Sequence, residues 1–512
     1  MCCKKLLVFL LSFTLVLVSL GTGAFTVSAA VKEGIYTYYT DPYDIKGAVI
    51  SKCDKSASGN ISIPSTLGGY AVKKINSYAF QDCTLIESIT IPDSVTIIGS
   101  SAFERCTSLK SIKIPDGVTE LGTSAFSGCT SLKRIELPDS ITFINGHTFF
   151  RCNSMEEILI PNSVTGIENF AFSYCSSLKD ITLPNSITFI GSGAFNGCVL
   201  FESIDISENV ETLAPTAFTG CTSLKNINVA SNNANYVSEN GILFNKDKTN
   251  IICYPPAKEG TSYTIPQGVT LLGNSVFSNC SSLENIYIPT GVTTIYNSAF
   301  SGCSSLKSIN IPDTVNAIYG NAFEKCTSLE NVNIPEGITT IDNYTFSECG
   351  SLESIDIPDS VTSINANAFY KCTSLKTITI PDGIKYIYSY TFNYCHSLKS
   401  IVIPSSVTNV YYSAFYMSGL TDIYYSGTEE EFAKIKINAS NDSFTSAQKH
   451  YNFTSVDADQ DGVYSADDAV LIRKALLLNN AVDIVFSDSY DINNDGVFNI
   501  LDYIKINNIL LG

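Results

Sequence analysis

Two acidic stretches near the end of the 512-residue chain carry the residue types that bind a divalent cation. The first, DADQDGVYSADD, covers residues 457–468, and the second, DINNDGVFNILD, covers residues 491–502. Oxygen-bearing side chains at loop positions 1, 3, 5, 9 and 12, glycine at 6 and a carbonyl at 7 match a calcium loop. We predict two Ca²⁺ ions. Their predicted ligands are Asp457, Asp459, Asp461, Val463, Ser465 and Asp468, and Asp491, Asn493, Asp495, Val497, Asn499 and Asp502.

An apolar segment at helical spacing follows each loop, at 469–478 and at 503–511, but no helix is predicted before the first loop. Each loop also closes with aspartate, where an EF-hand normally has glutamate. A duplicated calcium loop followed by a helix, within residues 456–512, resembles the type I dockerin module of cellulosomes. The expected fold of this segment is therefore a small α-helical, calcium-binding dockerin built from two loop-helix motifs.

The dockerin resemblance implies calcium-dependent docking onto a cohesin module of a scaffoldin. In that family the cohesin contacts come from loop positions 10 and 11 and from the following helix. The corresponding residues are Ala466, Asp467, Arg473 and Lys474 in the first half, and Ile500, Leu501, Asn507 and Asn508 in the second. The two halves differ chemically, and neither has the serine-threonine pair familiar from the family. Clustered carboxylates repel without the ion, so calcium binding is expected to be coupled to folding.

Most of the remaining chain repeats with a period of 23 residues, as in CTSLKSIKIPDGVTELGTSAFSG, residues 106–128. Leu109, Ile112 and Ile114 have the spacing of a short strand that points its apolar side chains inward. Pro115 ends that strand, and Phe126 fills the far side of the coil. No single unit can bury its apolar face alone, so the units must stack around a shared core.

The motif C-x-S-L-x-x-I-x-I-P-x-x-V-x-x-I-G-x-x-A-F resembles the BspA-like leucine-rich repeats of bacterial surface proteins. We therefore expect a repeat solenoid, built mainly from short β-strands, ahead of the dockerin. The predicted organisation is a signal peptide at 1–29, an N-terminal cap at 30–65, a solenoid at 66–425 with a hairpin insertion at about 231–265, a C-terminal cap or linker at 426–455, and the dockerin at 456–512. The C-terminal cap should contain a short helix from Glu429.

Thirteen of the 17 cysteines recur at one position of the repeat. Stacked neighbours would hold their Cβ atoms about 4.8 Å apart, which is wider than the usual span of a disulfide. We interpret these cysteines as small buried apolar residues, with disulfides or metal ligation as the alternatives. Free thiols outside the cell would indicate an anaerobic bacterial source.

Ligand binding should use residues that the coil does not need for packing. One such position lies between the last two apolar residues of each strand and holds a mixed polar set, from Thr90 and Lys113 to Asp356 and Thr379. Tyrosines accumulate near the end of the repeats and can stack on sugar rings or anchor a protein, although ordinary coil packing is the alternative. The candidate patch is Tyr386, Tyr388, Tyr390, Tyr411, Tyr412 and Tyr416.

The net charge of −18 argues against binding to nucleic acid or anionic lipid. The basic and apolar N-terminus predicts secretion, with a retained anchor as the alternative, and no later segment is long enough to insert into a membrane. His147, His396 and His450 are the only histidines, and no nucleophile, zinc or phosphate-loop motif occurs.

We therefore expect a secreted, non-catalytic binding protein, located in a cellulosome or at the cell surface. Its repeat array would bind a plant cell-wall polysaccharide or a protein. The alternatives are a glycoside hydrolase-like cellulosome enzyme, since two carboxylates can meet in space, and a protease inhibitor or cell-surface adhesin.

Overall fold

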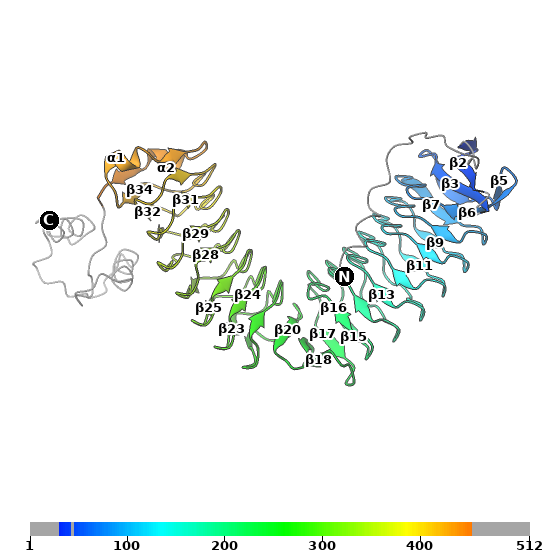
Figure 1. The fold of residues 1–512 in the computed structure, drawn as a ribbon, viewed down its shortest axis with the longest axis horizontal. Helices are drawn as coiled ribbons and strands as arrows, with labels where there is room; N and C mark the ends of the chain where they lie inside the picture. The colour runs from blue at the N-terminus through cyan, green and yellow to red at the C-terminus, as the bar shows by residue number, and fades with distance from the viewer. Residues whose placement is uncertain (1–29, 42–45, 453–512) are drawn as a thin grey trace, which may run out of the picture.

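A computed structural model describes residues 30–41 and 46–452. The predicted signal peptide at 1–29 and the dockerin at 456–512, with its calcium and cohesin residues, lie outside the described residues. Within them the chain winds into a stack of coils that bends into an open V (Figure 1). One arm begins with the N-terminal strands, the other ends at the two short helices, and the arms meet near β17–β20, whose bounds follow below.

Most coils form a first strand, and it lies in the part of the repeat where the sequence predicts a strand. These strands are β7 (Leu85–Thr90), β9 (Ser111–Lys113), β11 (Arg134–Glu136), β15 (Ser203–Ile206), β17 (Asn226–Val229), β21 (Ser262–Thr264), β23 (Asn285–Tyr287), β25 (Ser308–Asn310), β27 (Asn331–Val332), β30 (Thr377–Thr379) and β32 (Ser400–Ile403). Neighbouring coils pair in parallel with a register of one repeat, for example Ile112 with Ile135. The inward isoleucines are buried and the alternating side chains point outward, as period-2 alternation requires.

A second, two-residue strand forms on the opposite side of most coils. The set is β8 (Ile97–Ile98), β10 (Glu120–Leu121), β12 (Phe143–Ile144), β13 (Gly166–Ile167), β14 (Phe189–Ile190), β16 (Thr212–Leu213), β22 (Leu271–Leu272), β24 (Thr294–Ile295), β26 (Ala317–Ile318), β28 (Thr340–Ile341), β29 (Ser363–Ile364), β31 (Tyr386–Ile387) and β33 (Asn409–Val410). Their pairing is again parallel, as in Ile167 with Ile190. The coils therefore carry short parallel strands on two sides of their buried interior.

The first-strand sheet is interrupted, which the sequence does not predict. The coil at 155–160 forms only the single bridge between Glu136 and Leu159, and the coils at 178–183 and 352–357 form no such strand. Their inward residues, such as Ile181 and Ile355, remain buried. Packing of the apolar side chains therefore defines these coils without a continuous ladder of hydrogen bonds.

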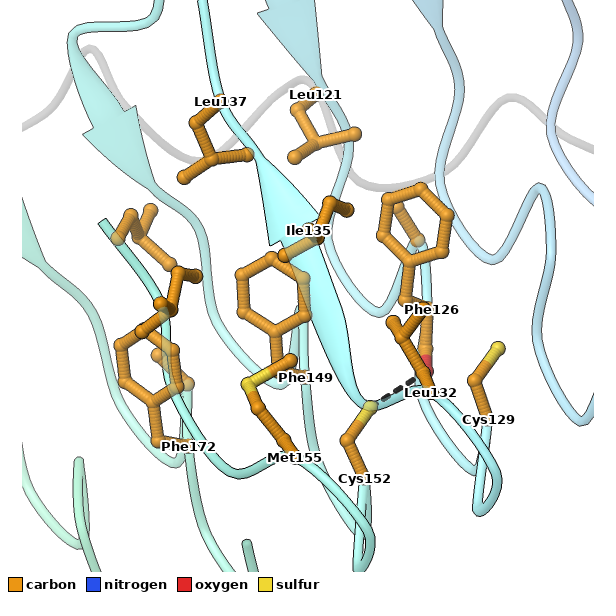
Figure 2. Close-up of a cluster of buried hydrophobic side chains, with 14 of the residues drawn as sticks. Leu121, Phe126, Cys129, Leu132, Ile135, Leu137, Phe149, Cys152, Met155 and Phe172 are labelled. Atoms are coloured by element: carbon orange, nitrogen blue, oxygen red, sulfur yellow. Dashed lines mark hydrogen bonds between the residues drawn. The ribbon is translucent and has the colours of Figure 1, made fainter. Parts of the chain in front are cut away.

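A column of phenylalanine rings runs through each arm. From Phe80 to Phe218 and from Phe277 to Phe415, consecutive rings are stacked with centroids 5.0–5.9 Å apart. Figure 2 shows Phe126, Phe149 and Phe172 in this column beside Leu132 and Ile135. Each ring is essentially inaccessible to solvent, and burial of one such side chain contributes about 2–3 kcal/mol. The repeated core is thus the main source of stability.

The repeat cysteines form a second buried column and are all free thiols. In eleven of the thirteen coils the Sγ donates to the carbonyl oxygen of the phenylalanine 26 residues earlier, as Cys152 does to Phe126 at 3.3 Å (Figure 2). That carbonyl already accepts the N–H of Cys129, so the thiol uses its second lone pair. Cys280 donates instead to the Tyr254 carbonyl and Cys83 to that of Asp54. The prediction of buried, unbridged cysteines is correct, and the structure adds a role as weak donors between coils.

The residue before each repeat cysteine has a left-handed backbone. In all thirteen coils its φ lies between 56° and 77°. Four coils place glycine there, which adopts this conformation without strain, whereas others hold bulky residues such as Arg151 and Tyr174. The N–H of Arg151 donates to the Ser173 carbonyl of the next coil at 2.8 Å. We call the thirteen residues that directly precede the repeat cysteines the left-handed ridge.

The array is closed at both ends by other pairings. At the N-terminus β1 (Val31–Glu33), β2 (Tyr36–Asp41) and β3 (Gly47–Cys53) are antiparallel, followed by β4 (Ser58–Ser62), β5 (Thr66–Leu67) and β6 (Tyr70–Ile75). At the C-terminus are β34 (Asp422–Tyr425), α1 (Glu429–Phe432), β35 (Lys436–Ile437), α2 (Asp442–Ser446) and β36 (Gln448–His450). Helix α1 begins at Glu429, where the sequence predicts it, and Thr428 and Glu431 form its capping box.

An irregular segment separates the two arms. Strands β18 (Tyr236–Glu239), β19 (Ile242–Asn245) and β20 (Asn250–Cys253) form successive antiparallel pairs, and β20 then pairs in parallel with β22. The buried residues form two clusters that meet here, since Leu243 belongs to the first and Phe244 to the second. The segment is therefore the joint between two separately packed cores. In the described part of the chain, no helix is long and apolar enough to cross a membrane.

Candidate binding surface

The predicted tyrosine patch divides into three groups. Tyr386, Tyr388 and Tyr411 lie on or beside strands β31 and β33, and their rings contact one another. Tyr388 and Tyr411 are nearly parallel, with centroids 5.5 Å apart. Tyr390 instead packs edge-on against Tyr412 at 5.7 Å. The sequence does not predict this division, because neighbouring residues of one coil leave the backbone in different directions.

Tyr416, the sixth predicted tyrosine, lies apart from both groups. Its ring packs edge-on against Tyr394 at 5.8 Å. Tyr394 was not among the predicted residues, although it occupies the left-handed ridge with φ 59°. The six predicted tyrosines therefore fall into three separate sets of ring contacts.

A surface hollow of about 380 Å³ lies beside the first tyrosine group. Its lining residues are Thr362, Ser363, Gly383, Lys385, Tyr386 and Tyr388. It lies where the parallel pairing of second strands stops at β29 and starts again at β31. One coil presents the small residues Thr362 and Ser363 at this place, and the next presents two tyrosines, so the change in side-chain size creates the hollow. We call it the tyrosine hollow.

The chemistry of the tyrosine hollow is amphipathic. Tyr386 is 39% exposed and offers a ring face, while Tyr388 is held by its stack with Tyr411. The hydroxyls of Thr362 and Ser363 donate to Thr339 O and Asn365 Oδ1, so their oxygens can accept a hydrogen bond from a ligand, and the ammonium group of Lys385 can donate one. Aromatic faces with nearby hydroxyls suit a ligand that is apolar on one face and polar at its edges.

The predicted polar position of the first strands does point outward. Thr90, Lys113 and Asp356 are exposed, whereas Thr379 is half-buried. The same position holds two exposed apolar residues, Leu159 and Tyr287. Charged residues elsewhere on the coils pair between neighbours, as Lys110 Nζ does with Glu87 Oε2 at 2.7 Å. Part of the surface charge is therefore neutralised by ion pairs between neighbouring coils.

Sequence reasoning missed an aromatic cluster in the first arm. The rings of His147 and Phe170 stack at 5.1 Å, and Phe150 meets Tyr174 edge-on at 5.8 Å. A Cβ on Gly193 would lie 2.5 Å from Phe170 Cε1, so the glycine leaves room for this ring. The sequence signal was the run of aromatic residues in two consecutive coils, at positions that hold Ser124, Ser127 and Gly128 in the coil before them.

The three histidines do not assemble a catalytic site. His147 belongs to the aromatic cluster, and His396 packs edge-on against Tyr394 at 5.8 Å. His450 Nε2 lies 2.9 Å from Asp422 Oδ1 and its ring stacks on Tyr424, which ties β36 to β34. Across the described ranges 30–41 and 46–452, no group of three or more metal-ligating side chains occurs.

Comparisons with known proteins agree with this architecture. The model of the BspA type leucine rich repeat region matches residues 73–167, 143–255, 253–372 and 316–446, and no catalytic family matches. A leucine rich cell surface protein from Faecalibacterium prausnitzii has a crystal structure that is 29% identical, covers 81% of this chain and 100% of its own, and has a TM-score of 0.57.

A leucine-rich repeat protein from Eubacterium ventriosum is 25% identical and covers 76% of this chain and 93% of its own, with a TM-score of 0.51. No curated protein matches the chain. The family model spans more than half of the sequence, and the coils that it matches are those whose phenylalanine and cysteine columns are described above. The chain therefore belongs to the BspA-type leucine-rich repeat family.

Proposed function

We propose that this protein is a non-catalytic binding protein outside the cell, whose repeat array holds a polysaccharide at the tyrosine hollow. The observation that carries this proposal is the pairing of the Tyr386 and Tyr388 rings with the hydroxyls of Thr362 and Ser363 around a space of about 380 Å³. This volume is within the range of small-ligand sites. A sugar ring offers C–H groups to an aromatic face and hydroxyls at its edge, which matches this lining.

Relatives support the cellular location in this proposal. The Faecalibacterium prausnitzii protein, which shares the fold over its whole length, is described as a cell surface protein. Leucine-rich repeat arrays are extended scaffolds that present repeated surface positions to a partner. Binding or adhesion at a surface therefore fits the fold better than catalysis.

Binding of the full-length protein to insoluble cellulose, xylan and pectin tests the glycan proposal. Tyr386→Ala removes one wall of the tyrosine hollow and should weaken binding at least tenfold, equivalent to about 1.4 kcal/mol. Tyr319→Ala is the matched control, because Tyr319 is 40% exposed and stacks on Tyr296 at 5.3 Å outside the hollow. Equal affinities for all three proteins, or equal losses in both variants, would contradict the assignment. Release of reducing sugar from these substrates would contradict a non-catalytic role.

The proposal includes attachment of the protein through residues 456–512. The resemblance of this segment to a dockerin supports calcium-dependent docking onto a cohesin. Asp457, Asp459 and Asp461 would hold one ion, and Asp491 and Asp495 the other, with the partners named above. The ions would neutralise the clustered carboxylates and so favour the folded module.

Capture by a panel of immobilised cohesins, in calcium or in excess chelator, tests the docking proposal. Capture should occur in calcium and disappear in chelator. Asp461→Ala with Asp495→Ala should abolish it, whereas Asp422→Ala, outside the segment, should not. Absence of calcium-dependent capture by every cohesin would refute the docking proposal and leave the glycan proposal standing.

A further inference from the structure

Four coils place a cation on the left-handed ridge, directly before the repeat cysteine. They form two types that differ in the preceding residue, which is glutamate in two coils and aromatic in the other two. The sequences are Phe103-Glu104-Arg105-Cys106, Phe149-Phe150-Arg151-Cys152, Phe323-Glu324-Lys325-Cys326 and Phe369-Tyr370-Lys371-Cys372. Each arm contains one of each type, and in each arm the aromatic type follows the glutamate type after two repeats, 46 residues.

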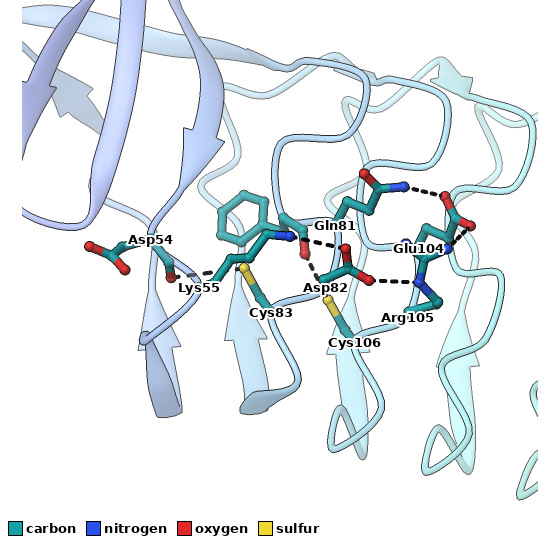
Figure 3. A network of polar contacts seen from close by, with 9 residues as sticks. Asp54, Lys55, Gln81, Asp82, Cys83, Glu104, Arg105 and Cys106 are labelled. Carbon is teal, nitrogen blue, oxygen red and sulfur yellow. Dashed lines mark hydrogen bonds and ion pairs between the residues drawn. The ribbon is translucent and has the colours of Figure 1, made fainter.

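In the glutamate coils the cation is neutralised by neighbouring carboxylates. Arg105 Nη1 lies 2.8 Å from Glu104 Oε1, and Arg105 Nε lies 2.6 Å from Asp82 Oδ1 (Figure 3). Lys55 also pairs with Asp82, at 3.0 Å. In the second arm, Lys325 Nζ lies 3.1 Å from Glu324 Oε1. The carboxylates of the protein therefore already neutralise the charges of Arg105 and Lys325.

In the aromatic coils the cation lies over a ring. Arg151 Cζ is 5.2 Å from the centroid of Phe150 and 5.7 Å from that of Tyr174. Lys371 Nζ is 5.1 Å from the centroid of Tyr370. Among the residues that the structure describes, neither Arg151 nor Lys371 forms an ion pair. The contact with the ring positions each cation but leaves its net positive charge, because an aromatic ring carries no net charge.

The ring geometry is also the same in the two arms. Phe150 meets Tyr174 edge-on with centroids 5.8 Å apart and an interplanar angle of 84°. Tyr370 meets Tyr394 with centroids 6.0 Å apart at 89°. In both cases the second ring belongs to the next coil and occupies the left-handed ridge. We call Phe150-Arg151-Tyr174 and Tyr370-Lys371-Tyr394 the two cation–aromatic sites.

We propose that the two cation–aromatic sites bind the carboxylate groups of an acidic polysaccharide, with one uronic acid unit at each site. The cation pairs with the carboxylate of the sugar, and the adjacent ring faces its C–H groups. What distinguishes Arg151 and Lys371 is that each is held over an aromatic ring and has no carboxylate partner among the described residues, so its charge can pair with an anionic ligand.

The duplication favours a polysaccharide over an acidic polypeptide. A polymer of one repeating acidic sugar presents the same group many times, so one chain can occupy two matching sites that lie in different arms. Simultaneous occupation raises the overall affinity well above that of either site. The inference rests on the proposed function, which supplies the ligand class, a glycan. It adds that the glycan bound at these two sites must be negatively charged.

Binding of the full-length protein to polygalacturonate tests the inference, with neutral xylan measured in parallel. Arg151→Gln and Lys371→Gln should each weaken polygalacturonate binding about tenfold, and the double variant should lose more than either. Arg105→Gln and Lys325→Gln are matched controls from the same repeat position and should change affinity less than twofold. Equal binding by the double variant and the unaltered protein, or equal losses in the controls, would overturn the proposal.

Further measurements separate the sources of negative charge and the two glycan proposals. Tyr174→Leu should weaken polygalacturonate binding while leaving any weak attraction to poly-glutamate unchanged. Competition by poly-glutamate as strong as that by polygalacturonate would overturn the choice of a sugar. Xylan binding that depends on Tyr386, without polygalacturonate binding, would refute the cation–aromatic sites alone. Polygalacturonate binding that depends on Arg151 and Lys371, without any effect of Tyr386→Ala, would refute the tyrosine hollow alone.

Discussion

One buried amide, that of Asn233, lies beside the joint between the two arms. The residue is inaccessible to solvent. Its Nδ2 donates to the carbonyl oxygens of Ser207 at 2.8 Å and Val210 at 3.1 Å, both in the preceding coil. Its Oδ1 accepts the N–H groups of Asn235 at 2.9 Å and Tyr236 at 2.8 Å. One side chain therefore connects the last regular coil of the first arm to β18.

Replacement of Asn233 by alanine should cost about 4 kcal/mol of unfolding free energy. The substitution removes the four hydrogen bonds, each with a net value of about 1 kcal/mol, and leaves their backbone partners buried. Aspartate should be at least as damaging, because it retains the two acceptor contacts but directs a buried carboxylate at two carbonyl oxygens. Stability in a repeat array is carried by contacts between neighbours, so the loss should weaken coupling between the arms.

Urea unfolding followed by circular dichroism and tyrosine fluorescence measures this effect, since the chain has no tryptophan. We expect a lower midpoint for Asn233→Ala and a transition that separates into two steps. Asn232→Ala is the control: its exposed side chain bonds to Glu208, so the change should cost less than about 0.5 kcal/mol. A loss below about 1 kcal/mol in Asn233→Ala, or similar losses in the two variants, would refute the reasoning.

Three other predictions concern the stacked core and its surface. Burial raises the pKa of several cysteine thiols to about 12. The stability that these thiols contribute is complete below about pH 8.5 and is lost as the pH rises toward 12. Native protein at pH 9 should therefore resist a thiol reagent that labels it rapidly in urea. These thiols are Cys198, Cys253, Cys303 and Cys395. Phe323→Ala should cost about 3–5 kcal/mol in urea unfolding, because the ring is stacked between Phe300 and Phe346, and Phe323→Leu should cost less. Glu284→Ala should cost less than about 1 kcal/mol, because its ion pair with Lys307 is exposed, and a loss above 2 kcal/mol would contradict this.

The sequence predicts the core well because the core repeats. Phe126 and Cys129 recur at fixed positions, and a residue that returns every 23 positions in a chain of stacked coils must meet its own copies. The joint is different, since Asn233 occurs once and its partners lie up to 26 residues earlier. A single polar residue carries no periodic signal, so its burial and its four partners emerge only from the folded chain.

The surface was predicted less well for a related physical reason. The number of tyrosines near the end of the repeats suggested a single patch. Their actual grouping depends on the direction in which the side chain leaves the backbone at each repeat position. Tyr386 and Tyr388 line one hollow, whereas Tyr416 joins Tyr394 on another part of the coil. Comparison of Glu104-Arg105 with Phe150-Arg151 would have separated paired from unpaired cations, because a glutamate before the cation supplies its partner.

The left-handed ridge explains how a repeat protein can vary its surface without disturbing its core. Its φ is set by the turn that precedes the buried cysteine, and glycine satisfies that turn in the coils of Gly128 and Gly302. A side chain at the same position is strained by about 1–2 kcal/mol. The side chain points outward and leaves the packing of the phenylalanine and cysteine columns unchanged, so the stability of the core offsets this strain. Nine of the thirteen coils carry a side chain at this position, so the fold tolerates the strain and the identity of the outward residue can change from coil to coil while the core stays the same.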